Sequence, residues 1–100
     1  MIEEVVVHLI VHGRVQGVGY RAFVEREATR RDLQGWVRNC ADGTVEALLT
    51  GNAAVVEDMI AACRRGPFGA RVDAIERAPG HASALKDRRP GQAFSVLPTI

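Results

Sequence analysis

The sequence has very little net charge. Its 13 basic and 12 acidic residues leave a formal charge of +1 at pH 7. Proteins that bind nucleic acids or membrane surfaces through bulk electrostatics usually carry a strong basic excess, so we expect no nucleic acid and no membrane as partner. A single local site for a small anion is compatible with this balance.

The sequence also has only two cysteines, Cys40 and Cys63. They form no C-x-x-C pair and have no histidine at the spacing of a zinc site, and one disulfide is the most that they allow. Neither begins a C-x5-R phosphatase loop, because Glu46 and Gly69 stand where that loop needs arginine. We therefore expect neither a bound metal nor a cysteine nucleophile.

A basic leader and a long apolar stretch are missing as well. The chain begins Met-Ile-Glu-Glu, without the positive segment of a signal peptide. No apolar run approaches the roughly 20 residues that cross a bilayer. These features predict a cytoplasmic protein. A length of 100 residues, 47% of them apolar, fits one globular domain over residues 1–100.

What the sequence does contain is a regular succession of strand and helix patterns. Apolar residues alternate with period two in residues 5–11 and 44–50, and they repeat with the helical period in two other segments. A polar stretch rich in Gly and Pro, residues 79–92, is typical of a loop. The predicted strands are 5–11, 34–39, 44–50 and 70–78, with a short last strand at 94–97, and the predicted helices are 21–32 and 53–65.

The order strand, helix, strand, strand, helix, strand is that of the split βαβ, ferredoxin-like arrangement. We predict an α+β fold (βαββαβ) in which two helices cover one face of a four- to five-stranded antiparallel sheet. Asp42-Gly43 is typical of a hairpin turn between the second and third strands. Asn52 is a good N-cap for the second helix, and Gly66-Pro67 ends that helix.

The loop between the first strand and the first helix carries three glycines, at positions 13, 17 and 19. Glycines allow backbone N–H groups to converge, and a helix N-terminus adds further donors, so such a loop can bind an anion. An ordinary strand–helix turn that needs glycine for its shape explains the local spacing equally well.

Arg21 follows in the first turn of the helix, where the helix dipole disfavours a cation. A bound phosphate would explain its position, because the guanidinium fork binds two phosphate oxygens at once. The alternative is a surface ion pair with Glu25, one turn later.

Two familiar phosphate motifs fit this loop poorly. A Walker A loop needs Gly-Lys followed by Ser or Thr, and this segment has none. The segment 17–22 does match the dinucleotide pattern G-x-G-x-x-A, with Asp42 about twenty residues later. However, Asp42 lies in a predicted hairpin turn rather than at the end of a parallel strand. A chain of 100 residues is also too short for a full doubly wound domain.

A second segment, residues 35–51, favours a phosphate site over an ordinary turn or a dinucleotide site. Asn39 alone is typical of a turn at a strand end. Taken together, however, the two segments resemble the acylphosphatase family over roughly residues 5–97. The first matches that family's signature at Gly13, Val15, Gln16, Gly17, Val18 and Arg21, and the second matches its companion pattern at Gly35, Trp36, Val37, Asn39, Gly43, Val45 and Gly51.

The resemblance implies hydrolysis of a carboxyl–phosphate bond to a carboxylate and inorganic phosphate, without cofactor or metal. It places the family's substrate-binding arginine on Arg21, its water-positioning asparagine on Asn39 and a supporting threonine on Thr44. We expect a monomer whose partners are a small acyl phosphate and inorganic phosphate. The substrate-binding loop, acting through backbone N–H groups, falls on Arg14, Val15, Gln16, Gly17, Val18, Gly19 and Tyr20.

Some positions depart from the family pattern. Tyr20 stands where phenylalanine is frequent, and Cys40 stands where threonine is familiar in animal members. The tail, residues 97–100, lacks the basic-aromatic ending of some relatives, so a C-terminal ion pair is not expected.

The remaining reactive side chains fit structural positions. His8 and His12 share one face of the first strand, and Trp36 and Cys63 fit packing positions. Two other function classes stay open on the residues alone. One is an anion-binding module without catalysis on the same fold. The other is a small RNA-binding domain, which would need an aromatic sheet face that the sequence does not show.

Overall fold

The structure, a computed structural model, describes residues 3–100. Its main elements follow the order predicted from the sequence, and the predicted loop 79–92 contains a 3-10 helix, η1. None of the helices formed by the described residues has the length and apolar character needed to cross a membrane. The elements are β1 (Glu4–Arg14), α1 (Tyr20–Arg30), β2 (Gln34–Asn39), β3 (Val45–Asn52), α2 (Ala53–Arg65), β4 (Arg71–Pro79), η1 (Ala82–Asp87) and β5 (Phe94–Val96).

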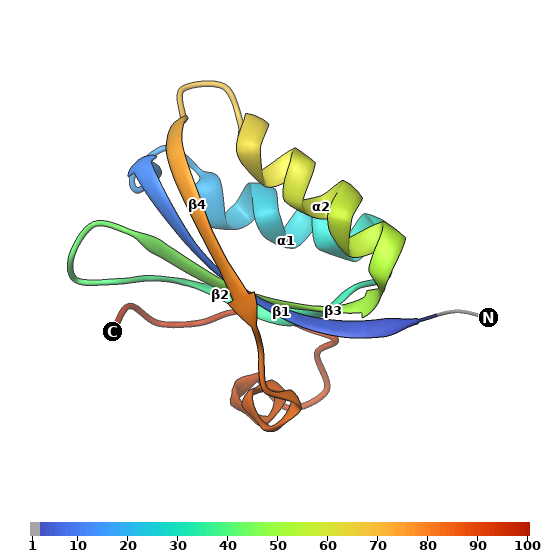
Figure 1. Cartoon of the computed structure of the whole chain (residues 1–100). Helices are drawn as coiled ribbons and strands as arrows, with labels where there is room; N and C mark the ends of the chain where they lie inside the picture. Colours follow the sequence, from blue (N-terminus) through green and yellow to red (C-terminus); the bar gives the residue numbers. More distant parts are fainter. Residues whose placement is uncertain (1–2) are drawn as a thin grey trace.

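The strands form one sheet in the order β4-β1-β3-β2-β5. β1 pairs antiparallel with β3 and β4, and β2 pairs antiparallel with β3. Both helices cover one face of this sheet (Figure 1). The ferredoxin-like fold predicted from the sequence is therefore confirmed.

The last strand is the one departure from an antiparallel sheet, because β5 runs parallel to β2. β4 lies at one edge of the sheet and β5 at the other, so the chain between them must cross the sheet's open face. Figure 1 shows η1 on that face, opposite the two long helices. Ala84 and Leu85 of η1 pack there against a small buried cluster of Trp36, Leu48 and Leu97.

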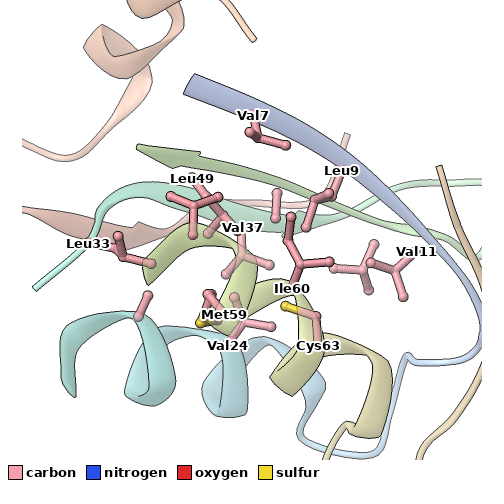
Figure 2. Packing of buried hydrophobic residues seen from close by; sticks show 14 of the residues in the cluster. Val7, Leu9, Val11, Val24, Leu33, Val37, Leu49, Met59, Ile60 and Cys63 are labelled. Carbon is pink, nitrogen blue, oxygen red and sulfur yellow. The ribbon is translucent and has the colours of Figure 1, made fainter. Parts of the chain in front are cut away.

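The main core lies between the sheet and the two helices (Figure 2). Alternate residues of β1, including Leu9 and Val11, are buried, as their period-two pattern predicts. α2 contributes its predicted apolar stripe, which includes Met59, Ile60 and Cys63. Cys63 is thus a packing residue, and both cysteines of the chain are free thiols.

The opposite face of β1 carries the two histidines, as predicted. His8 contacts Glu46 of β3 at 2.6 Å, and His12 contacts a glutamate of β4. Trp36 is buried on this face and donates its indole N–H to the carbonyl oxygen of Ala84 at 2.9 Å. These side chains link neighbouring strands and η1 on this face of the sheet, and none of them belongs to the strand–helix loop.

Gly13 follows an irregularity in the pairing of β1 with β4, because the register shifts between His12 and Gly13 before pairing continues. Its φ of 130° is a conformation that L side chains rarely adopt. A Cβ at this position would lie 2.1 Å from the carbonyl oxygen of Arg71. No side-chain rotation relieves this overlap, since the contacted atom belongs to the backbone.

We predict that Gly13→Ala lowers the free energy of unfolding by about 3 kcal/mol, from backbone strain and overlap together. Denaturant unfolding followed by circular dichroism measures this loss. Gly91→Ala is the matched control, because Gly91 also has a positive φ, of 81°, but has open space around it. We expect the control to lose only about 1 kcal/mol, from the left-handed conformation alone. Equal losses in the two variants would contradict the overlap.

Candidate active site

The segment between β1 and α1 turns sharply at two glycines. Gly17 has a φ of 74° and Gly19 a φ of 78°, both in the left-handed region that favours glycine. No atom outside the neighbouring residues lies within 4 Å of a Cβ placed at either position. These glycines are therefore needed for the backbone conformation, and the space above them is open to a ligand.

The start of α1 differs from the start of α2 in its capping. At α2 the side chain of Asn52 accepts hydrogen bonds from the N–H groups of Ala54 at 2.8 Å and Val55 at 3.3 Å. At α1 the N-cap is Gly19, which has no side chain, and the first turn holds no acidic residue. The first N–H groups of a helix have no acceptor within the helix. At α1 they are left available to an anion.

Arg21 extends from this first turn and is half-buried. Its guanidinium forms no ion pair with any of residues 3–100, whereas the guanidinium groups of Arg31 and Arg38 each pair with a glutamate. The alternative interpretation of Arg21 as the partner of Glu25 is therefore not what the structure shows. A partly buried cation without a partner, beside open helix N–H groups, provides donors and a positive charge for an anion.

Asn39, the last residue of β2, lies across the cavity from the loop. Its Oδ1 atom is the one buried side-chain N or O of residues 3–100 that has no hydrogen-bond partner. Leaving such an acceptor unpaired costs about 1–3 kcal/mol. The cavity has a volume of about 270 Å³ and is lined by Val15, Gly17, Gly19, Tyr20, Arg21, Ala22, Glu25, Asn39 and Val96.

Gln16 and Thr44 support the cavity without lining it. The Nε2 atom of Gln16 donates to the carbonyl oxygens of Cys40 at 2.9 Å and Thr44 at 2.8 Å, on both sides of the β2–β3 turn. The Oγ1 atom of Thr44 donates to the carboxylate of Asp42 at 2.6 Å within that turn. Gln16 thus ties the loop to the hairpin that carries Asn39.

Three other residues of the predicted substrate loop turn their side chains elsewhere. Arg14 is exposed at the end of β1, opposite Arg71, and lies outside the residues that line the cavity. Val18 packs against the core. The Tyr20 ring is buried, and its hydroxyl donates to the carbonyl oxygen of Cys63 at 2.8 Å. Burial raises the pKa of Tyr20 above its usual range, so the phenol stays protonated at neutral pH.

Sequence reasoning did not place Ala22, Glu25 and Val96 in the site. A signal for Glu25 was present, because a residue four positions after Arg21 on a helix lies on the same surface. Val96 belongs to β5, and no local sequence pattern predicts the parallel pairing with β2 that brings this residue to the cavity. Within residues 3–100, no group of three or more His, Cys, Asp or Glu side chains is placed to hold a metal ion.

The C-terminal tail was also not expected to support the site. The N–H of Ile100 donates to the carbonyl oxygen of Asn39 at 3.2 Å, and the N–H of Ala41 donates to the carbonyl oxygen of Ile100 at 2.8 Å. These backbone bonds hold the chain around Asn39, in addition to those of Gln16. They need no basic or aromatic side chain, so the departure of the tail sequence does not remove them.

Comparisons with known proteins show which family the chain belongs to. The family model for acylphosphatase matches residues 7–88. An acylphosphatase of Rhodopseudomonas palustris (strain BisB18) is 57% identical over 96 residues, which cover 96% of this chain and 97% of the relative. An acylphosphatase of Nitrobacter hamburgensis is 54% identical over 98 residues, which cover 98% and 99%.

The fold agrees as well. The crystal structure of acylphosphatase from Bacillus subtilis superimposes with a TM-score of 0.80 at 35% sequence identity, covering 93% of this chain and 98% of that one. The agreement in sequence and in structure extends over nearly the whole length of each chain. This protein therefore belongs to the acylphosphatase family, the enzymes that hydrolyse acyl phosphates.

Proposed function

We propose that the cavity between the β1–α1 loop and Asn39 is the active site, and that it hydrolyses the carboxyl–phosphate bond without a metal. Arg21 and the open N–H groups at the start of α1 bind the phosphoryl oxygens, and Asn39 positions the attacking water. One observation carries this proposal: an arginine with an unpaired guanidinium and an asparagine with an unpaired, buried amide oxygen line the same cavity.

The chemistry requires little more than these groups. Phosphoryl transfer depends mainly on positioning and on stabilisation of charge, and the carboxylate of an acyl phosphate is a good leaving group. The side-chain amide of Asn39 hydrogen-bonds the water and so directs a water lone pair at phosphorus. The new oxygen–phosphorus bond forms as the old one breaks, and its electron pair leaves with the carboxylate. An amide is not a base, so the water proton passes to a phosphoryl oxygen.

Release of phosphate from benzoyl phosphate tests the proposal directly. The wild-type protein is expected to turn over this substrate, and to do so equally well after dialysis against EDTA. Phosphate binding without turnover would instead identify an anion-binding module, and loss of activity in EDTA would overturn the metal-free mechanism. A dinucleotide site predicts that NADH binds, so a flat fluorescence titration with NADH removes that alternative.

We further propose that the protein works in the cytoplasm as a monomer of one domain, residues 1–100, and that it binds no nucleic acid. Two free thiols suit a reducing compartment. The net charge of +1 gives no basic surface for a nucleic acid. Sedimentation at micromolar concentration tests the oligomeric state, and a dimer there would contradict the proposal.

Gln16 is expected to act by positioning the hairpin that carries Asn39. Methionine matches its length but donates no hydrogen bond, so Gln16→Met leaves two backbone carbonyl oxygens without this donor. We predict a loss of about 2 kcal/mol in unfolding free energy. Because small displacements of a catalytic group are costly, we also predict a fall in kcat of about tenfold or more. Gln34→Met, at an exposed position of β2, is the control. A Gln16→Met protein with full kcat would contradict the positioning role.

A further inference from the structure

Glu25 brings a carboxylate into the proposed active site. It lies one helical turn after Arg21, is half-buried, and lines the cavity. It forms no ion pair with any of residues 3–100, although other glutamates of the chain, such as Glu27 and Glu46, do. Glu25 is the one anionic side chain among the lining residues.

The charges of the site are balanced before substrate binds, with one guanidinium and one carboxylate in the lining. A phosphoryl group brings about two negative charges at neutral pH, which Arg21 and the helix N–H groups compensate. The side chains of Ala22, Glu25 and Val96 bring no hydrogen-bond donor to the lining. An acyl group that contacts these side chains meets a surface that is apolar except for one carboxylate.

We propose that Glu25 selects the substrate by the charge of its acyl group. The site would accept acyl phosphates with a neutral or cationic acyl group and would discriminate against those with a second carboxylate. This inference rests on the proposed function of the cavity and names the substrate class that its lining favours.

The field of Glu25 extends over the whole cavity. A cavity of about 270 Å³ is comparable in width with the Debye length of about 8 Å at physiological ionic strength. Arg89 is a cation that contacts the lining from outside, since its Nε donates to the carbonyl oxygen of Val96 at 3.3 Å. Arg89 is exposed and does not line the cavity, so it reduces the field of Glu25 without cancelling it.

The test compares three substrates: benzoyl phosphate, its 4-carboxy derivative and its 4-aminomethyl derivative. The intrinsic reactivity of the carboxyl–phosphate bond differs among the three substrates. This difference cancels when kcat/KM of wild type and of Glu25→Gln is compared on the same substrate. Removing the carboxylate is expected to raise kcat/KM for the 4-carboxy substrate, relative to benzoyl phosphate, by about fivefold. For the cationic substrate the same ratio is expected to fall. Both changes should shrink at high salt, where such interactions are screened.

Glu27→Gln is the matched control, because Glu27 lies on the same helix and pairs with Arg30 and Arg31 outside the cavity. It should leave the ratios unchanged. Identical ratios in wild type and Glu25→Gln, with good turnover of all three substrates, would overturn the selection by charge. A uniform fall in kcat for all three would overturn it too and would make Glu25 part of the catalytic step. Absence of any wild-type turnover would instead overturn the proposed function.

Discussion

Arg21→Ala is expected to lower kcat/KM for benzoyl phosphate by about 10³-fold or more, as loss of a cation that stabilises transferring phosphate does elsewhere. Arg21 is the one cationic side chain that lines the cavity, so no neighbour replaces it. Arg21→Lys keeps the charge but loses the planar fork, and we expect it to recover only a part of this loss. Steady-state phosphate release measures all three proteins.

The fold should survive this substitution. A cation in the first turn of a helix is unfavourable by a few tenths of a kcal/mol, so Arg21→Ala is expected to unfold at the same denaturant concentration as wild type or slightly higher. Arg26→Ala is the matched control, since Arg26 is an exposed arginine of the same helix and lies over the Phe23 ring, 5.7 Å from its centroid. Comparable activity in the two alanine variants would refute the assignment of Arg21.

The fold could be predicted from the sequence because its information is local. The alternation in β1 and the apolar stripe of α2 each place one face in the core, and Asn52 and Gly66 mark the two ends of α2. Once six elements are recognised in order, few topologies remain. The order of Arg21 after the glycines was likewise visible, because the loop, the helix start and the arginine are contiguous in the sequence.

The contacts that complete the site could not be predicted in this way, because they join distant segments. The side chain of Gln16 donates to the carbonyl oxygens of Cys40 and Thr44. The local sequence around Gln16 indicates only that this residue lies in a loop. The parallel pairing of β5 and the backbone bonds of Ile100 depend on how the chain crosses the open face of the sheet. For Arg21 and Glu25, helical spacing suggested an ion pair that the structure does not contain.

Asn39→Ala is expected to lower kcat by about 10²-fold or more, by analogy with the loss of a single positioned hydrogen-bonding group in other enzymes. KM should change much less, because Asn39 positions water and the phosphate is bound by Arg21 and the helix N–H groups. Asn39→Asp places a negative charge beside the phosphoryl group and is expected to lower kcat and raise KM. A full rate in Asn39→Ala would show that water is positioned by another group.

The same substitution should not destabilise the protein, which separates a catalytic role of Asn39 from a structural one. The Oδ1 atom of Asn39 is buried without a partner, and removing it relieves a cost of about 1–3 kcal/mol that offsets the lost packing of the side chain. Asn52→Ala is the opposite case, because the side-chain Oδ1 of Asn52 caps α2 and its loss costs about 1 kcal/mol. We therefore expect Asn39→Ala to be stable but inactive and Asn52→Ala to be active but less stable. Denaturant unfolding and phosphate release, measured on both variants, test this reversal, and a large loss of stability in Asn39→Ala would contradict it.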